Sequence, residues 1–185
     1  MISDWKKEIA IAWHVQDETA KLDKHQLWEY FLPKVAASEQ ELAETESVLG
    51  YAIDPRYREF LSYANGWRCF LQRVDLFGTA ELRGGRAMRD ACSALENIDS
   101  EVLAKSTLVR SDLLPIGFSG EQGDLFVLLK PSSTKPGTIA WFAGYEIERY
   151  PIFDGFFLAM VDYNRLRLER FRSGESKEYG DASPF

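Results

Sequence analysis

The chain carries few residues of the kinds that bind metals or attack substrates. Its two histidines are His14 and His25, and its two cysteines are Cys69 and Cys92. A structural zinc site needs about four nitrogen or sulfur ligands, and these four residues lack ligand spacing. Neither cysteine belongs to a C-x-x-C pair, so we expect two buried, reduced thiols. We interpret both histidines as helix-surface residues and expect no bound metal.

Motifs for nucleophilic catalysis and nucleotide binding are missing from the sequence as well. It contains no G-x-S-x-G elbow, no phosphate-binding loop and no G-x-G-x-x-G pattern. Gly84-Gly85 lacks the Lys-Ser/Thr of a phosphate loop, so we interpret it as a turn. The 29 acidic residues leave room for a carboxylate pair of the glycosidase type, which would require a cleft. We expect no cofactor and no catalysis, and an enzyme ranks third among the possible functions.

Four residues are candidates for contact with a protein partner. Trp67 and Arg68 follow Asn65-Gly66, which should stop a helix, and Glu121 and Asp124 belong to a glycine-flanked acidic turn that is too short for a calcium loop. Both stretches lie outside the helical stripes and could face solvent. The alternative is that Trp67 packs in the core and that the two acids only keep the turn soluble.

A basic stretch offers a weaker candidate. Arg83, Arg86 and Arg89 recur at every third position and could meet phosphate or an acidic partner, or simply lie on a solvated surface. The chain as a whole is acidic, with a net charge of −7 and a pI near 5.0. Such a charge repels nucleic acid and attracts a basic protein.

Length and composition indicate one globular domain. The chain has 185 residues, 45% of them hydrophobic and 14% aromatic, which we assign mainly to the core, with some rings possible as exposed binding anchors. The longest apolar stretches, 125–129 and 156–161, are too short to span a bilayer, and the first residues do not form a signal peptide. We therefore expect a cytoplasmic protein without a membrane contact.

Helices are predicted in the first third of the chain. The stripe that predicts the first helix is Trp5, Ile9, Ala12 and Trp13. A second helix is predicted after Asp23, with Leu27, Tyr30 and Phe31 on one side and Pro33 at its end. The capping box Ser38-x-x-Glu41 and the pair Asp54-Pro55 predict helices over 39–49 and 55–64.

The remainder predicts a sheet and a closing helix. Residues 68–75 and 77–82 are strand-like, 86–110 suggest one or two helices, and clear strands are predicted over 113–118, 124–130 and 138–142, with a short fourth over 147–150. A helix is predicted over 153–170. The fold class is α+β, with a mostly antiparallel central sheet flanked by helices. The predicted core includes Phe60, Leu61, Phe157 and Val161.

The order of these motifs resembles the SUKH superfamily of yeast cell-wall-synthesis regulators and bacterial immunity proteins. The matching residues are Ser38-x-x-Glu41, Glu46-x-x-Leu49-Gly50, Ile53-Asp54-Pro55-x-Tyr57-Arg58-x-Phe60-Leu61, Asn65-Gly66, Leu114-Pro115-Ile116-Gly117, Gly123-Asp124 and Phe153-Asp-Gly-Phe156-Phe157-Leu158. The chain departs from the family pattern at Asp54, where the family usually has Leu, and in the inserted-looking stretch 83–110.

The resemblance covers roughly residues 38–170 and implies a single SUKH-like domain over 1–172. Residues 1–37 would be a helical extension packed on it, and 173–185 a flexible tail. It also implies a non-catalytic immunity protein that neutralises a bacterial toxin by direct binding, the toxin being basic and possibly a nuclease. The alternative is a regulatory or scaffold protein without a toxin partner, as in the fungal members.

Overall fold

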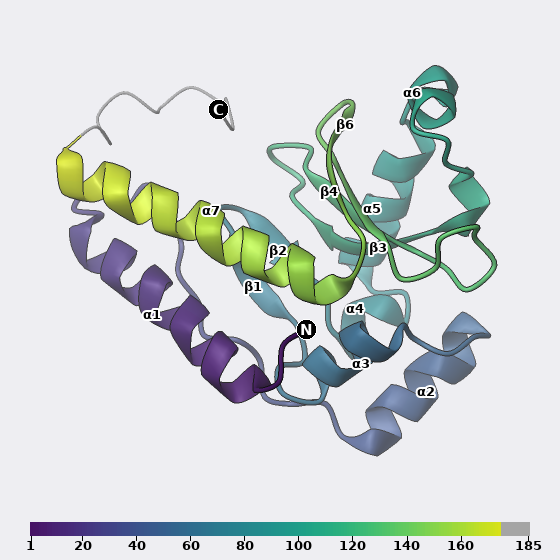
Figure 1. Ribbon diagram of the computed structural model, residues 1–185, viewed down its shortest axis with the longest axis horizontal. Coiled ribbons are helices and arrows are strands. Elements are labelled where there is room, and N and C mark those ends of the chain that lie inside the picture. The colour runs from purple at the N-terminus through teal and green to yellow at the C-terminus, as the bar shows by residue number, and fades with distance from the viewer. Residues whose placement is uncertain (175–185) are drawn as a thin grey trace.

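One antiparallel sheet forms the centre of the molecule (Figure 1). The computed structural model describes residues 1–174, and all bounds below refer to them. The strands pair in the order β1-β2-β3-β4-β5-β6, each beside its neighbour in sequence. Their bounds are β1 Trp67–Leu71, β2 Val74–Leu76, β3 Leu113–Phe118, β4 Leu125–Leu129, β5 Ile139–Phe142 and β6 Glu146–Tyr150. The α+β class with an antiparallel sheet is confirmed.

Helices cover both faces of this sheet. Their bounds are α1 Trp5–Leu22, α2 Glu39–Leu49, α3 Pro55–Leu61, α4 Thr79–Leu82, α5 Arg86–Glu96, α6 Ser100–Lys105 and α7 Phe153–Ser173, with a 3-10 turn η1 at Arg110–Asp112. Helix α7 crosses the sheet from β6 to β1 with α1 at its side, while α5 packs on β3 and β4 (Figure 1). Every residue of β4 is buried, as expected for a strand covered on both faces.

The two helices with the strongest sequence signals form as predicted. Ser38 and Glu41 exchange hydrogen bonds as a capping box, and α2 ends at Gly50 in the left-handed conformation with φ 78°. The carboxylate of Asp54 accepts the backbone N–H groups of Arg56 and Tyr57 at 3.0 and 3.1 Å, which starts α3. Helix α3 ends at Leu61, earlier than the predicted residue 64, because the chain turns there toward β1.

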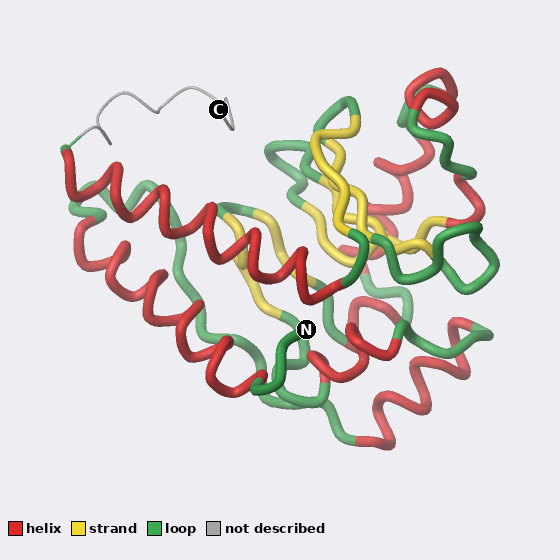
Figure 2. The backbone as a smooth tube through the Cα atoms, in the orientation of Figure 1, coloured by secondary structure: helices red, strands yellow, loops and turns green. Residues whose placement is uncertain are grey.

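The predicted second helix after Asp23 is wrong. Residues 23–37, called the strap below, run without regular structure from α1 to α2 (Figure 2). The Asp23 carboxylate accepts the N–H groups of Leu27 and Trp28, both at 3.0 Å, which closes a turn in place of a helix. Further along, the strap bonds to distant backbone, with the Ala37 N–H donating to the Leu61 carbonyl at 2.9 Å.

The strand predicted over 77–82 is also wrong, because β2 ends at Leu76 and α4 follows. The Asn65 side chain accepts the Thr79 N–H at 2.7 Å and donates to the Thr79 hydroxyl at 2.8 Å, which fixes the start of α4. Gly66, at φ 89°, approaches Gly78 so closely that a Cβ on it would lie 2.6 Å from the Gly78 nitrogen. Asn65 and Gly66, which follow α3, therefore pack directly against the start of α4.

The core is built on aromatic rings and includes the first helix. Phe60, Leu61, Phe157 and Val161 are at most 2% exposed, as predicted. Trp5 of α1 packs edge-on against Phe60 and Phe157, with ring centroids 5.5 and 5.2 Å apart. Helix α1 thus shares a core with α3 and α7.

Helix α7 extends further than predicted. It continues to Ser173, where the predicted tail would begin, and Gly174 caps it at φ 79°. The rest of that tail, 175–185, lies outside the described residues. Within residues 1–174, no helix combines the length and the apolar composition needed to cross a membrane.

Candidate functional site

Two of the four candidate partner-binding residues lie inside the molecule. Trp67 is fully buried, and its Nε1 donates to the Phe31 carbonyl at 2.7 Å. Asp124 is 8% exposed and accepts the Trp141 Nε1–H at 2.7 Å. Burial raises the pKa of the Asp124 carboxyl, although this hydrogen bond opposes the rise. The alternative that Trp67 packs in the core is therefore confirmed, and Asp124 does not face solvent either, because each side chain finds its polar partner in the interior.

The other two candidates are exposed and take part in ion pairs. The Arg68 guanidinium lies over the Phe31 ring, 4.1 Å from its centroid, and its Nη2 is 3.0 Å from a carboxylate oxygen of Glu29. Glu121 forms an ion pair with Arg73. The structure therefore connects both residues to partners that the sequence did not single out.

The strap joins these two pairs into one surface. Trp28 lies near two guanidinium groups, and its ring centroid is 5.8 Å from the Arg73 Cζ and 5.5 Å from the Arg167 Cζ. The ring of Phe31, three residues further along the strap, packs against the Arg68 guanidinium. We call this surface the strap face and define it as Trp28, Glu29, Phe31, Arg68, Arg73, Glu121 and, beneath them, Arg167.

Among the described residues, Arg167 is the one cationic side chain with buried nitrogens that lack a hydrogen-bond partner. Its Nη2 donates to the Asn164 Oδ1 at 2.7 Å, but its Nε and Nη1 are enclosed and have no hydrogen-bond partner among the described residues. Burial lowers the pKa of the guanidinium, and nearby Tyr30 and Asp23 oppose that effect. Leaving a buried donor unpaired costs about 1–3 kcal/mol, and more for a charged group.

Three of the four non-glycine residues with a positive φ in the described chain lie in the same region, the fourth being Thr107. The backbone of Gln26, Cys69 and Gln72 is unusual, because a non-glycine residue rarely adopts a positive φ. Their φ values are 50°, 51° and 52° for residues 26, 69 and 72. Residue 26 lies in the strap, while 69 and 72 lie in β1 and in the turn to β2. Such conformations cost about 1–3 kcal/mol each and cluster at functional sites.

The cysteine in this region is not a nucleophile. Cys69 is buried, and burial raises the pKa of its thiol to about 11. The thiol therefore stays protonated at neutral pH, and it is the thiolate that attacks substrates. Cys92 on α5 is exposed, contrary to the expectation that both thiols are buried, and the pKa of its thiol is also raised, mainly by desolvation.

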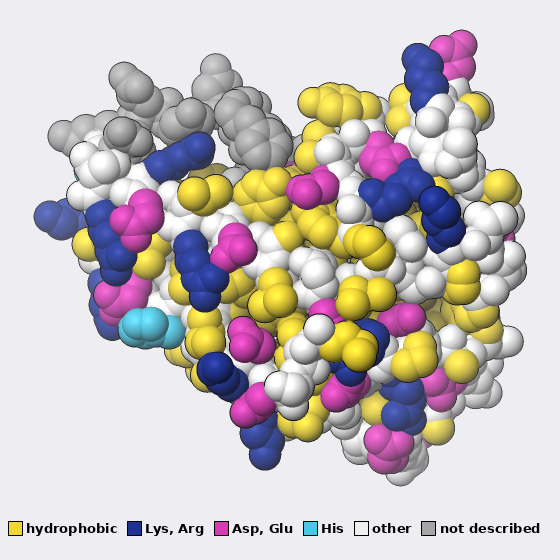
Figure 3. Space-filling view, viewed as in Figure 1, with side chains coloured by type: hydrophobic (Ala, Val, Ile, Leu, Met, Phe, Trp, Pro, Cys, Tyr) yellow, Lys and Arg dark blue, Asp and Glu magenta, His cyan; other side chains and the backbone are white. Residues whose placement is uncertain are grey.

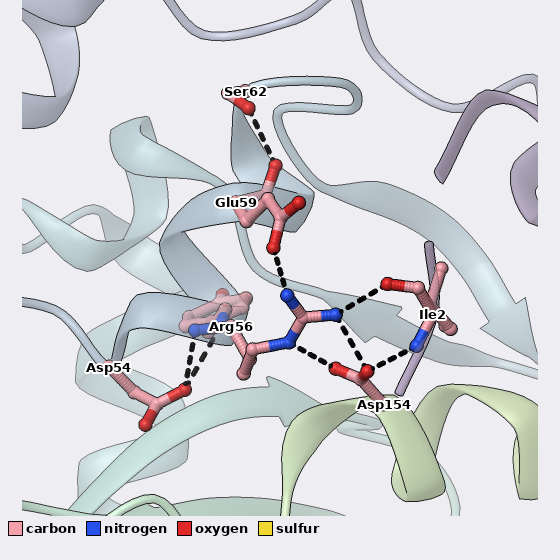
Figure 4. Close-up of polar contacts among 7 residues, drawn as sticks. Ile2, Asp54, Arg56, Glu59, Ser62 and Asp154 are labelled. Atoms are coloured by element: carbon pink, nitrogen blue, oxygen red, sulfur yellow. Dashed lines mark hydrogen bonds and ion pairs between the residues drawn. The ribbon is translucent and has the colours of Figure 1, made fainter. Parts of the chain in front are cut away.

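A second polar centre, around Arg56, uses every nitrogen of the guanidinium as a donor (Figure 4). Arg56 of α3 donates from Nε and Nη2 to the Asp154 carboxylate at 2.8 and 2.7 Å, from Nη2 to the Ile2 carbonyl at 2.8 Å, and from Nη1 to Glu59. The Ile2 N–H also donates to Asp154, at 2.6 Å. We call this centre the clamp, because it ties the N-terminal segment to α3 and α7.

The electrostatics of the clamp suit a structural joint. Burial acts to raise the pKa of Asp154, but the hydrogen bonds from Arg56 and Ile2 outweigh it and hold the pKa below its usual value. The carboxylate is ionised at neutral pH and is occupied on both oxygens. Neither group is free to transfer a proton or bind a substrate.

The structure also assembles one cluster with possible metal ligands, which the sequence did not reveal. His14, Asp17 and Glu18 of α1 offer ligand atoms within 4.8 Å of one another, and within residues 1–174 no other group of this kind forms. Both carboxylates already bond to the Lys21 ammonium, at 2.7 and 2.8 Å. A cation would have to displace Lys21, so the cluster is suited to a helix-surface ion pair.

The three arginines after α4 and in α5 find local partners. Arg83 pairs with Glu44 at 2.8 Å, Arg86 with Asp90 at 3.6 Å, and Arg89 donates to the Gly84 carbonyl at 2.9 Å. These contacts fit a solvated surface. On the face shown in Figure 3, acidic and basic side chains also alternate along α1 and α7 and do not form a patch of one sign.

Comparison with known proteins identifies one family. The sequence model of the SMI1 / KNR4 family (SUKH-1) matches residues 36–158, about two thirds of the chain. No curated protein matches the sequence. The matched range begins near the end of the strap and ends inside α7, so α1 and most of the strap lie outside it.

The residues that carry this family pattern perform structural tasks. Glu46 accepts the Ile53 N–H at 3.1 Å and pairs with Arg58 at 3.3 Å. The Tyr57 hydroxyl donates to the Phe77 carbonyl deep in the core. These contacts account for both residues within the fold.

Proposed function

Because the chain belongs to the SMI1 / KNR4 family (SUKH-1), we propose that it is a non-catalytic protein-binding domain. More specifically, we propose an immunity protein that binds a cognate bacterial toxin in the cytoplasm and thereby neutralises it. The binding surface in this proposal is the strap face, which contains Arg68 and Glu121. Trp67 lies directly beneath it and supports it from the core.

The observation that carries this proposal is the contrast between satisfied and unsatisfied groups. Arg56 and Asp154 are fully engaged within the fold, whereas the strap face combines exposed ion pairs, two aromatic rings and the enclosed donors of Arg167. Aromatic and arginine side chains are the residue types that dominate the energy of protein interfaces. Exposed ion pairs contribute little to stability and can exchange partners on binding.

Charge supports a basic toxin, possibly a nuclease. The chain has a net charge of −7, so its field accelerates the approach of a basic domain. Glu29 and Glu121 are 65% and 67% exposed at the side chain, and each pairs with an arginine of the strap face, Arg68 or Arg73. The attraction for a basic domain therefore comes from the net charge of the whole chain, and the two carboxylates could exchange these arginines for cations of the partner. The toxin would be blocked by occlusion, through an interface of roughly 1,600 Å².

A regulatory or scaffold role without a toxin is the alternative, supported by the same family membership. A toxin gene directly beside the gene for this chain would favour immunity, and its absence would favour regulation. Both roles require protein binding, and neither requires catalysis.

Co-expression tests the immunity role directly. Cells that produce the neighbouring toxin should grow when they also produce this chain, and should stop growing when it carries Glu121→Lys together with Trp28→Ala. Glu96→Lys is the matched control, since Glu96 is 73% exposed and also pairs with an arginine, Arg110, but lies on α5. Failure of the wild-type chain to protect the cells would refute the immunity role.

A further inference from the structure

An open apolar groove lies where α1 meets the strap and the end of α3. Its volume is about 480 Å³, within the range of roughly 300–1,000 Å³ typical of binding pockets. The side chains that matter for its chemistry are Ile9, Trp13, Leu32, Tyr63 and Lys6. We call it the α1 groove.

The α1 groove exists because α1 has more apolar surface than the core covers. Trp5, Ala12 and Val15 are buried in the protein, whereas Ile9 and Trp13 are only partly buried and line the groove. Across the groove, Leu32 is 64% exposed and Tyr63 is 40% exposed. Contiguous exposed apolar side chains of this kind mark interaction sites, because burying them gains roughly 25 cal/mol per Å².

Most of the α1 groove is built outside the segment that the family model matches. Helix α1 and the strap residues Leu32 and Pro33 precede residue 36, where the match begins, whereas Ala36 and the far wall at Ser62 and Tyr63 belong to the matched segment. The N-terminal segment therefore adds a surface that the family pattern does not define.

The charges around the α1 groove select its occupant. Lys6 is the only charged side chain that lines it, is exposed, and forms no ion pair within the described part of the chain. We propose that the groove docks a segment of a partner protein that presents a large aliphatic or aromatic side chain next to a carboxylate. The apolar side chain fills the space between Trp13 and Leu32, and the carboxylate pairs with Lys6.

Self-association fits this groove less well. In a two-fold symmetric dimer the same patch faces itself, and the lining of the groove supplies no carboxylate that could pair with Lys6 of the other copy. A membrane surface also fits less well, because a chain of net charge −7 is repelled by anionic lipids. A partner with an acidic group beside its apolar side chain matches both features. This inference goes beyond the proposed function, since it holds for a toxin or for a regulatory partner.

A random peptide library displayed on phage tests the specificity of the α1 groove. Peptides are selected on the wild-type protein and depleted on Leu32→Asp. Retained peptides should carry Trp, Phe, Leu or Ile close to Asp or Glu. Their affinities, from fluorescence polarisation, should fall at least about tenfold, roughly 1.4 kcal/mol, on Leu32→Asp. Val48→Asp on α2, at a residue that is 61% exposed, is the matched control and should leave affinity unchanged.

Charge exchange sharpens this test. Lys6→Glu should lower the affinity for the selected acidic peptides several-fold and should raise the affinity for versions in which Lys replaces the acid. Circular dichroism checks that each variant is folded. The proposal is overturned if no peptide prefers the wild type to Leu32→Asp, or if Lys6→Glu leaves the charge preference unchanged.

Two further outcomes would overturn the proposal in favour of another occupant. Sedimentation that shows a dimer dissolved by Leu32→Asp would assign the α1 groove to a second copy. Binding of the wild type, but not Leu32→Asp, to phosphatidylcholine vesicles would assign it to a membrane. None of these outcomes depends on the toxin, so the immunity role stands or falls separately.

Discussion

Two arginines, Arg56 in the clamp and Arg167 beneath the strap face, lie in contrasting surroundings. All three nitrogens of the Arg56 guanidinium donate to oxygen acceptors, and the carboxylate of Asp154 receives two of these bonds. Only Nη2 of Arg167 has an acceptor, although its Nε and Nη1 are equally withdrawn from solvent. One chain thus holds a completed polar network and an incomplete one.

Under the proposed function, the contrast between Arg56 and Arg167 separates structural from functional polarity. Buried polar groups in native proteins are nearly always paired, so an exception requires a reason. The guanidinium nitrogens and carboxylate oxygens of the clamp contain no such exception, because their bonds join the N-terminal segment, α3 and α7. At the strap face, the unpaired donors of Arg167 occur beside positive φ values at the neighbouring residues 26, 69 and 72. These features reduce stability, and partner binding is the function that would justify them.

Loss of the clamp carboxylate should have the largest effect. Asp154→Ala leaves the Arg56 guanidinium without its main partner, and breaking one side of such a pair costs about 3–5 kcal/mol of unfolding free energy. Urea unfolding measures this cost. Glu59→Gln, on the exposed side of Arg56, is the control and should cost less than about 1 kcal/mol. A cost below about 1 kcal/mol for Asp154→Ala would show that the clamp is not a structural joint.

Acid should weaken the clamp as well. The folded-state pKa of Asp154 lies below its unfolded value of about 3.9. The contribution of Asp154 to the unfolding free energy is therefore complete above the unfolded pKa and disappears as the pH falls through the folded pKa. The stability difference between wild type and Asp154→Ala should therefore shrink below about pH 4. Urea titrations at several pH values measure it. A difference that stays constant down to pH ~2 would contradict the ionised pair.

Arg167→Met should change stability far less than Asp154→Ala. The substitution loses the bond to Asn164 but removes an enclosed charge with two unpaired donors. Replacement of buried charges by apolar groups of similar size is often neutral, so we expect a change within about 1 kcal/mol. Partner affinity should fall nonetheless. A destabilisation of 3 kcal/mol or more, as estimated for the clamp, would make Arg167 a structural residue and remove the contrast.

Glu121→Lys should have the smallest effect on folding. Its side chain is 67% exposed, so the unfolding free energy should change by no more than about 0.5 kcal/mol. Association with a basic partner should slow, and the difference from wild type should narrow as salt rises, because charges are screened beyond roughly 8 Å at physiological ionic strength. Stopped-flow mixing at two salt concentrations measures both. Equal association rates for the two proteins would exclude electrostatic steering at this residue.

The sequence predicted elements whose signals are local. The capping box at Ser38 and the Asp54-Pro55 start fix α2 and α3 through bonds within a few residues. The strap and α4 were not predicted, because bonds between distant segments decide them. Asp23 closes a turn where a helical stripe seemed to continue, and Asn65 holds Thr79 from across the fold.

The candidate surface was predicted only in part for the same reason. Arg68 and Glu121 were found as polar residues outside helical stripes. Trp67 and Asp124 met the same criterion, but their partners, Phe31 and Trp141, come from other elements. Trp28 and Phe31 were assigned to a helix, which concealed them as surface residues.

Titration calorimetry with the toxin domain encoded beside this gene tests the central claim most directly. The toxin should bind the wild-type chain, and should bind the strap-face variant Trp28→Ala with Glu121→Lys at least about tenfold more weakly. The control Glu96→Lys, which reverses an equally exposed charge on α5, should keep the wild-type affinity. Equal affinity of all three proteins would contradict the strap face as the binding surface, and no binding by the wild type would contradict neutralisation by direct contact.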